Sequence, residues 1–289
     1  MVGELKEFRI LNLGAGVQST ACYLLAEECR MYGEDVIDCA IFADTGEEPV
    51  AVYQHLAWLR NRGTIPILDR TRGRLGEDLK KGQNATRQRF ASIPAFTSEV
   101  EGQKGGMTRR QCSKEYKVEV IERAIRREVL GLKPRQRIPA SVHVFQYYGI
   151  SLDEAGRAGR IAARAKEHKW LTVKFPLLKL GWTRADCIDF LADRVPHEVP
   201  KSACVFCPYH SDAEWLNIKA VPEDWKRAVE IDSALRTTGS VANRQMSQKM
   251  YVHRSCLPLT QIEFNPKPTP REFQTNLAFN YECQGVCGN

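Results

Sequence analysis

The chain has 289 residues, of which 43% are hydrophobic and 27% are charged, so it can bury one substantial core plus an extension. No apolar run approaches a membrane span, and the N-terminus lacks the pattern of a signal peptide, so we expect a cytoplasmic protein with no membrane partner. In a reducing compartment its ten cysteines are poor candidates for a disulfide framework and better candidates for metal ligation or sulfur chemistry.

The first predicted element is an apolar strand, residues 8–13, which runs into a Gly-Ala-Gly turn and then into a helix. Glycine permits backbone angles closed to other residues and lets main-chain N–H groups approach an anion. Hydroxyl donors stand where the helix begins, at its positive end. The pattern predicts a phosphate cradle, although a plain strand-to-helix connection has the same appearance. The candidate residues are Gly14, Ala15, Gly16, Gln18, Ser19 and Thr20.

The next predicted strand, residues 38–43, ends in Asp44-Thr45-Gly46. Strand, helix and strand form a parallel unit, and ligands of such sheets lie beyond the carboxyl ends of the strands. We therefore expect the Gly14 turn and the Asp44 turn to line one crevice. Asp44 is a candidate to hold magnesium or a ribose hydroxyl, and it is equally suited to capping a helix.

The glycine turn lacks the ending of a Walker loop and the third glycine of a dinucleotide-binding turn. It resembles the pyrophosphate-binding loop of the N-type ATP pyrophosphatases, SGGxDS. Ser19 matches that motif, whereas Gly14, Ala15 and Gln18 depart from it, and Gln18 stands where the family often has Asp. The resemblance implies an enzyme that binds ATP and Mg²⁺ and splits ATP between its α and β phosphates to activate a substrate as an adenylate.

The cysteines fall into two groups. Those in predicted helices and strands are expected to act as small hydrophobic residues, and they are Cys22, Cys29, Cys39 and Cys187. Those in loop-like sequence are Cys112, Cys204, Cys207, Cys283 and Cys287. A two-residue spacing, as in Cys204-Val205-Phe206-Cys207, lets both sulfurs reach one metal. Spacing leaves an iron–sulfur cluster, a structural zinc and metal-free redox thiols as alternatives.

The stretch Arg109-Arg110-Gln111-Cys112-Ser113-Lys114-Glu115-Tyr116-Lys117, followed later by Cys204 and Cys207, resembles the layout of adenylylsulfate reductases and of DNA phosphorothioation sulfurtransferases. The resemblance implies that Cys112, Cys204 and Cys207 hold a 4Fe-4S cluster beside the nucleotide. The fourth ligand would be Cys283, Cys287 or Cys256, or would be absent. The catalytic candidates are the sulfur carriers Cys283 and Cys287 and the phosphate-binding Arg109 and Arg110.

The likeness to the phosphoadenylylsulfate reductase superfamily covers about residues 8–215 and includes residues 148–157, which contain the nucleotide-site candidates Gly149 and Arg157. It implies an α/β fold with a doubly wound, mainly parallel sheet, similar to adenine nucleotide α-hydrolases. We expect the nucleotide-binding domain to occupy residues 1–200. Residues 201–289 are expected to form a partly helical, cysteine-bearing extension with an extended tail.

Basic residues gather at positions 70–117, and the helix predicted over residues 118–130 turns Arg123, Arg126 and Arg127 outward. A solvated charged face is one interpretation, and a track for a polyanion is the other, consistent with a net charge of +7.

The favoured function is an ATP-dependent sulfurtransferase that adenylates a substrate and replaces oxygen with sulfur from sulfide or a sulfur-donor protein. Because of the basic track, we expect the substrate to be a nucleic acid. One alternative is an adenylylsulfate or phosphoadenylylsulfate reductase. The other is a zinc-stapled nucleic-acid-binding module. The oligomeric state has no signature in the sequence.

Overall fold

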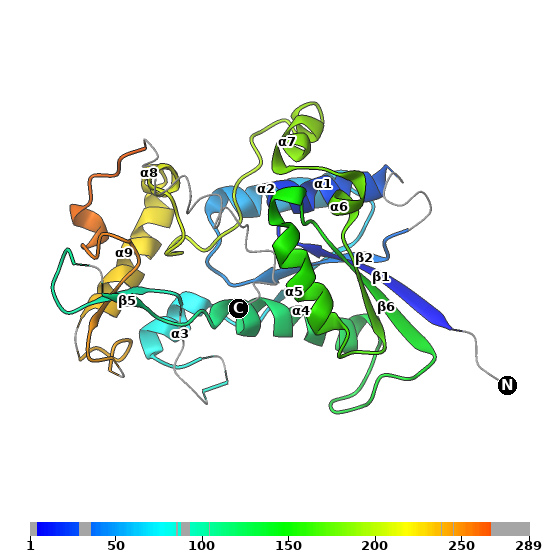
Figure 1. Cartoon of the computed structure of the whole chain (residues 1–289), viewed down its shortest axis with the longest axis horizontal. Coiled ribbons are helices and arrows are strands. Elements are labelled where there is room, and N and C mark those ends of the chain that lie inside the picture. Colours follow the sequence, from blue (N-terminus) through cyan, green and yellow to red (C-terminus); the bar gives the residue numbers. More distant parts are fainter. Residues whose placement is uncertain are drawn as a thin grey trace.

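The structure, a computed structural model, describes residues 5–28, 36–84, 86–87, 93–103, 105–237, 239–244 and 246–266. Its centre is a five-stranded, all-parallel sheet with strand order β3-β2-β1-β6-β7 (Figure 1). The strands are β1 (Lys6–Leu13), β2 (Cys39–Asp44), β3 (Ile67–Thr71), β6 (Val142–Tyr148) and β7 (Leu171–Lys174). The predicted parallel α/β sheet is confirmed.

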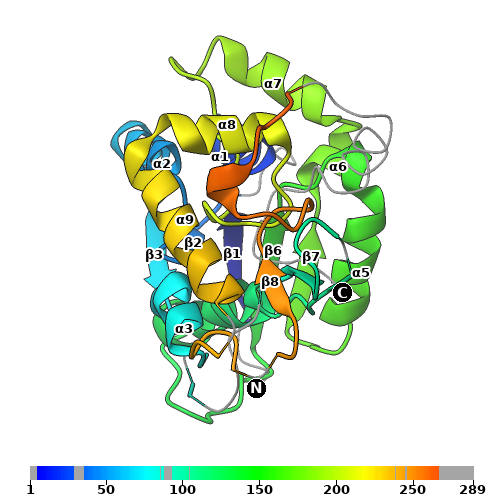
Figure 2. The same ribbon diagram turned by 90° about the vertical axis from the view of Figure 1, so that its left-hand side faces the viewer.

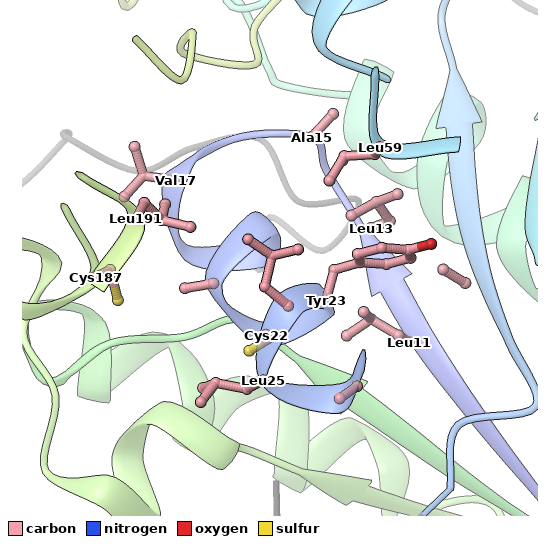
Figure 3. Packing of buried hydrophobic residues seen from close by; sticks show 14 of the residues in the cluster. Leu11, Leu13, Ala15, Val17, Cys22, Tyr23, Leu25, Leu59, Cys187 and Leu191 are labelled. Atoms are coloured by element: carbon pink, nitrogen blue, oxygen red, sulfur yellow. The ribbon is translucent and has the colours of Figure 1, made fainter. Parts of the chain in front are cut away.

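Helices cover both faces of this sheet, as the near-continuous apolar strands require. On one face, α1 (Val17–Glu27) packs against α2 (Val50–Arg62) and α7 (Arg184–Ala192), with α6 (Pro176–Leu180) beside them. Figure 3 shows Tyr23 of α1 beside Leu59 of α2, and Val17 beside Leu191 of α7. On the other face lie α4 (Glu119–Ala124) and α5 (Ala155–Ala165).

The strand order reverses between β1 and β6. From β1 the chain proceeds outward to β2 and β3, and it later returns to the opposite side of β1 as β6 and β7. Ligands of open parallel sheets bind at such a reversal, beyond the carboxyl ends of the strands. The segments that follow β1, β2 and β6 there begin at Gly14, Thr45 and Gly149.

The helix predicted over residues 118–130 is present, and Ile121 and Ile125 are buried as expected. It is not a uniform α-helix. Two π-helical segments, η1 (Lys114–Val118) and η2 (Ile125–Val129), flank α4. Single π turns within helices are frequent at functional sites, because the extra residue re-aims the side chains of that turn.

A second layer packs beside the carboxyl edge of the parallel sheet (Figure 2). It contains an antiparallel sheet of order β5-β4-β8, formed by β4 (Phe96–Ser98), β5 (Gly106–Met107) and β8 (Lys249–Tyr251). Its helices are α3 (Leu75–Lys81), α8 (Asp212–Ala220) and α9 (Pro222–Arg236), with the short 3₁₀ turn η4 (Leu259–Gln261). A further 3₁₀ turn, η3 (Leu152–Glu154), connects β6 to α5 in the parallel-sheet part. Its core joins Leu75 and Tyr116 to Trp215 and Met250, so it draws on both sides of the boundary predicted at residue 200.

Among the described residues, no helix is both long and apolar enough to cross a membrane. Cys29 and the predicted cysteine-bearing tail with Cys283 and Cys287 lie outside the described residues.

Candidate nucleotide and cysteine site

The glycine turn after β1 is closed by hydrogen bonds between Gly16 and Ser19. The Gly16 N–H donates to Ser19 Oγ over 3.2 Å, and that hydroxyl donates back to the Gly16 carbonyl over 3.1 Å. Ala15 lies in the left-handed region, with φ of 58°. Residues 14–20 are all buried, so an anion can reach this turn only if the surrounding segments move.

Gly149, which follows β6, lies directly against the start of α1. A Cβ atom added at position 149 would lie 2.8 Å from the Gln18 carbonyl atoms and from the Ser19 nitrogen. Only glycine fits this approach of two backbones without displacing one of them. The Gln18 amide spans the same seam and donates to Ser151 Oγ over 3.4 Å. Gly149 and Gln18 therefore join the two sides of the sheet reversal.

Thr20 points away from the turn, into the interface of α1 and α2. Its Oγ1 lies 2.9 Å from His55 Nε2, and His55 Nδ1 lies 2.9 Å from His197 Nε2. Its own N–H donates to the Gly16 carbonyl within the helix. Burial, and then the neighbouring His197, lower the pKa of His55 to about 4. In this structure the Thr20 hydroxyl stabilises helix packing.

The turn after β2 connects the sheet edge to the cysteines. Asp44 Oδ1 accepts hydrogen bonds from the Gly46 N–H at 2.7 Å and the Tyr53 hydroxyl at 2.9 Å. This carboxylate thus orders the turn. The next residue, Thr45, places its Oγ1 3.2 Å from Cys204 Sγ.

Three of the predicted metal ligands line one small cavity with mostly apolar walls: Cys112, Cys204 and Cys207. Arg110 and Lys117 also line it, as does Thr45. All three cysteines are free thiols. The cavity therefore brings three sulfur donors and two cationic side chains together within mostly apolar walls.

The Cys204–Cys207 turn is held by hydrogen bonds of its own backbone and of His210. The Cys207 N–H donates to the Cys204 carbonyl over 2.8 Å, and His210 Nε2 lies 2.9 Å from the same oxygen. The other His210 ring nitrogen lies 3.5 Å from Glu214 Oε2. His210 therefore orients the turn through a carbonyl group.

A buried ion pair beside the cavity was not predicted from the sequence. Lys117 Nζ lies 3.1 Å from Glu48 Oε1, and both side chains are at most 5% exposed. The second Glu48 oxygen accepts from Ser202 Oγ at 3.0 Å. Burial and the Glu48 charge raise the pKa of the Cys204 thiol, while Lys117 and the Thr45 hydrogen bond oppose that rise. The sequence signal that could have indicated this ion pair is the Glu47-Glu48 pair, which follows the Asp44 turn.

The three arginines predicted as site residues do not lie together, and each has different surroundings. Arg110 stacks over the Tyr209 ring, with its guanidinium carbon 5.2 Å from the ring centroid, whereas Arg109 is exposed. Arg157 is buried and forms an ion pair with Glu154 at 3.2 Å. Cys256 packs with Phe96 and Tyr251 in a separate apolar cluster and does not line the cysteine cavity.

The residue types of the cavity suit a soft metal or an iron–sulfur cluster, since thiolate sulfur is the preferred ligand of both. The sulfurs are not in a ligating arrangement: within the described ranges, no group of three or more His, Cys, Asp or Glu side chains is placed to hold a metal ion. Comparison with protein-family models, with curated proteins and with solved structures found no match.

Proposed function

We propose that the protein is an ATP-dependent sulfurtransferase that adenylates a nucleic-acid substrate and then replaces the activated oxygen with sulfur. The observation that supports it best is the contact between Thr45 and Cys204. This contact joins the carboxyl edge of a parallel sheet, where nucleotides bind, to a cavity lined by three thiols.

In the first step of the proposal, an oxygen of the substrate attacks the α-phosphorus of ATP, and the bond to the β-phosphate breaks. The leaving pyrophosphate needs positive electrostatic potential, which the N-terminus of α1 and its Gly16 and Ser19 donors would supply once the turn is accessible. Asp44 is the carboxylate available to hold Mg²⁺, which commonly uses one or two carboxylates together with substrate phosphates.

In the second step, sulfide sulfur attacks the activated atom of the substrate, and AMP leaves with the oxygen. Arg110, which lines the cysteine cavity, would place a positive charge beside such an anionic nucleophile. A 4Fe-4S cluster would be held by Cys112, Cys204 and Cys207, and bound there it would supply a site for sulfide. Cys283 and Cys287 remain candidates for a fourth ligand or a sulfur carrier.

The test of the first step is pyrophosphate release from ATP in the presence of nucleic acid. Ser19→Ala removes the hydroxyl that closes the turn and is expected to slow release at least tenfold, with a stability loss of about 1 kcal/mol. Ser233→Ala, an exposed hydroxyl on α9, is the matched control. Sulfite formation from adenylylsulfate without pyrophosphate release would instead identify a reductase and overturn the proposal.

The test of the cysteine cavity is iron and acid-labile sulfide content after anaerobic purification. Cys204→Ser and Cys207→Ser are each expected to abolish bound iron, whereas Cys256→Ala should retain it. Zinc in place of iron, without a brown chromophore, would favour the nucleic-acid-binding module.

A further inference from the structure

A second cavity, of about 560 Å³, lies at the edge of the parallel sheet between β3 and the α4–η2 helix. Four arginines line it: Arg70, Arg72, Arg123 and Arg127. We name this cavity, with these four residues, the arginine groove. The sequence analysis placed Arg70 and Arg72 in a basic stretch and Arg123 and Arg127 in the helix predicted over residues 118–130, and the fold brings them together.

Each half follows from the local geometry of its element. Arg70 belongs to the edge strand β3, and Arg72 follows the last residue of that strand, so both lie at its carboxyl end and line the cavity. Arg123 and Arg127 are four residues apart on a helix, so they share one stripe. The end of β3 therefore lines one side of the cavity with arginines, and the α4–η2 helix lines the other.

The arginine groove carries an excess of positive charge. Glu128 pairs with Arg70, and Glu119 pairs with Arg72, which leaves two cations in excess. Both ion pairs are partly exposed, with side chains 24–37% accessible. Such pairs contribute only about 0–1 kcal/mol, so a phosphate can replace the carboxylate at little cost.

Three other basic residues of the stretch at positions 70–117 pair with carboxylates away from the groove. Lys117 is buried against Glu48, Arg74 lies 3.5 Å from Glu47, and Lys80 lies 2.6 Å from Glu77. The structure thus places Arg70 and Arg72, two residues of the expected polyanion track, opposite the helix that carries Arg123 and Arg127.

The arginine groove is also connected to the cysteine cavity. Arg72 donates to the backbone carbonyl of Glu115, over 3.2 Å, in the π-helical segment η1. That segment contains Lys117, which lines the cysteine cavity. The same π-helical segment therefore contacts the arginine groove and the cysteine cavity.

We propose that the arginine groove binds the sugar–phosphate backbone of a nucleic-acid strand and delivers it to the cysteine cavity. This inference rests on the proposed function and specifies its substrate class. Guanidinium groups suit the task, because their planar fork matches phosphate oxygens and remains charged at any working pH. A groove lined from two sides is also much larger than one phosphate group.

The experiment measures binding of fluorescein-labelled oligonucleotides to the full chain by fluorescence anisotropy across a salt series. The Arg123→Glu/Arg127→Glu variant is expected to bind at least tenfold more weakly, with a salt slope shallower by roughly 0.7 for each lost phosphate contact. Arg123→Glu alone leaves the Arg127 hydrogen bond to Leu132 intact and should show part of the effect. Arg160→Glu, an exposed arginine on α5, is the matched control.

Equal loss of affinity in the Arg160 control and the groove variants would overturn the inference, as would wild-type binding without salt dependence. Arms with single-stranded DNA, duplex DNA and RNA identify which phosphodiester strand fits best. The pyrophosphate assay separates the two proposals. Groove-dependent binding without ATP cleavage would contradict the proposed enzyme activity and support the arginine groove as a binding site. ATP cleavage with unaltered binding in the groove variants would support the enzyme activity and contradict the role of the groove.

Discussion

The hydroxyl of Thr45 lies 3.2 Å from the sulfur of Cys204, although the two residues are 159 positions apart in the chain. Thr45 follows strand β2 at the carboxyl edge of the parallel sheet, and Cys204 begins the cysteine turn. A single contact therefore connects the two parts of the candidate site.

Thr45→Val removes this hydrogen bond and keeps the side-chain shape. Because the bond lowers the pKa of the Cys204 thiol, its loss should reduce the thiolate fraction. We expect alkylation of metal-free protein at Cys204 to slow by roughly fivefold, the equivalent of about 1 kcal/mol. Peptide mass spectrometry measures this, with Cys207 as the internal control. An unchanged Cys204 rate would show that the contact does not stabilise the thiolate.

Gly149→Ala should destabilise the protein, because the new methyl group would lie 2.8 Å from the backbone at Gln18 and Ser19. The expected loss is about 1–3 kcal/mol in urea unfolding, together with weaker ATP binding. Gly156→Ala is the control, since a methyl group there meets nothing within 4 Å in helix α5. It should stabilise by about 0.4–1 kcal/mol. Similar stability of the two variants would mean that the seam accommodates a side chain.

Lys117→Met should be strongly destabilising, because it leaves the Glu48 carboxylate buried without its cation. The expected cost is roughly 3–5 kcal/mol. Adding Glu48→Gln removes the orphaned charge, so the double variant should recover much of that loss. Urea unfolding of the two single variants and the double variant gives the coupling directly. Additive losses would contradict a direct ion pair.

Stability should fall on acidification because of His55. Its pKa is lowered from 6.5 to about 4, so the unfolded chain binds more protons between these two pH values. The loss accumulates as pH falls from 6.5 to about 4, and it amounts to roughly 3 kcal/mol at most. His55→Gln should flatten this part of the profile of unfolding free energy against pH. A variant as acid-sensitive as the wild type would assign the effect to other groups.

The elements that were predictable from the sequence depend on local patterns. The strand before Gly14 and the strand before Asp44 are apolar runs that end in turn residues, and both are present in the parallel sheet. The helix containing Ile121 and Ile125 follows from its periodicity. Its π-helical ends do not, because the i to i+5 hydrogen bond leaves no recognisable spacing in one sequence.

The parts of the site that escaped prediction depend on long-range packing. Thr20 was expected to face the nucleotide, but the rotation of α1 directs its hydroxyl to His55. Lys117 belonged to a basic stretch and reads locally as an exposed charge. Its burial against Glu48 is set by tertiary structure, and so is the meeting of Cys112 with Cys204. Sequence resemblance, not spacing, suggested that meeting.

The origin of the three thiols has a consequence for biogenesis. Cys112 precedes a helix of the parallel sheet, whereas Cys204 and Cys207 come from the start of the last helical layer. A ribosome must therefore have synthesised more than two thirds of the chain before the thiols can meet. Any inorganic group held by all three thiols could therefore be bound only after the ribosome has passed Cys207, and not while the N-terminal half of the chain folds.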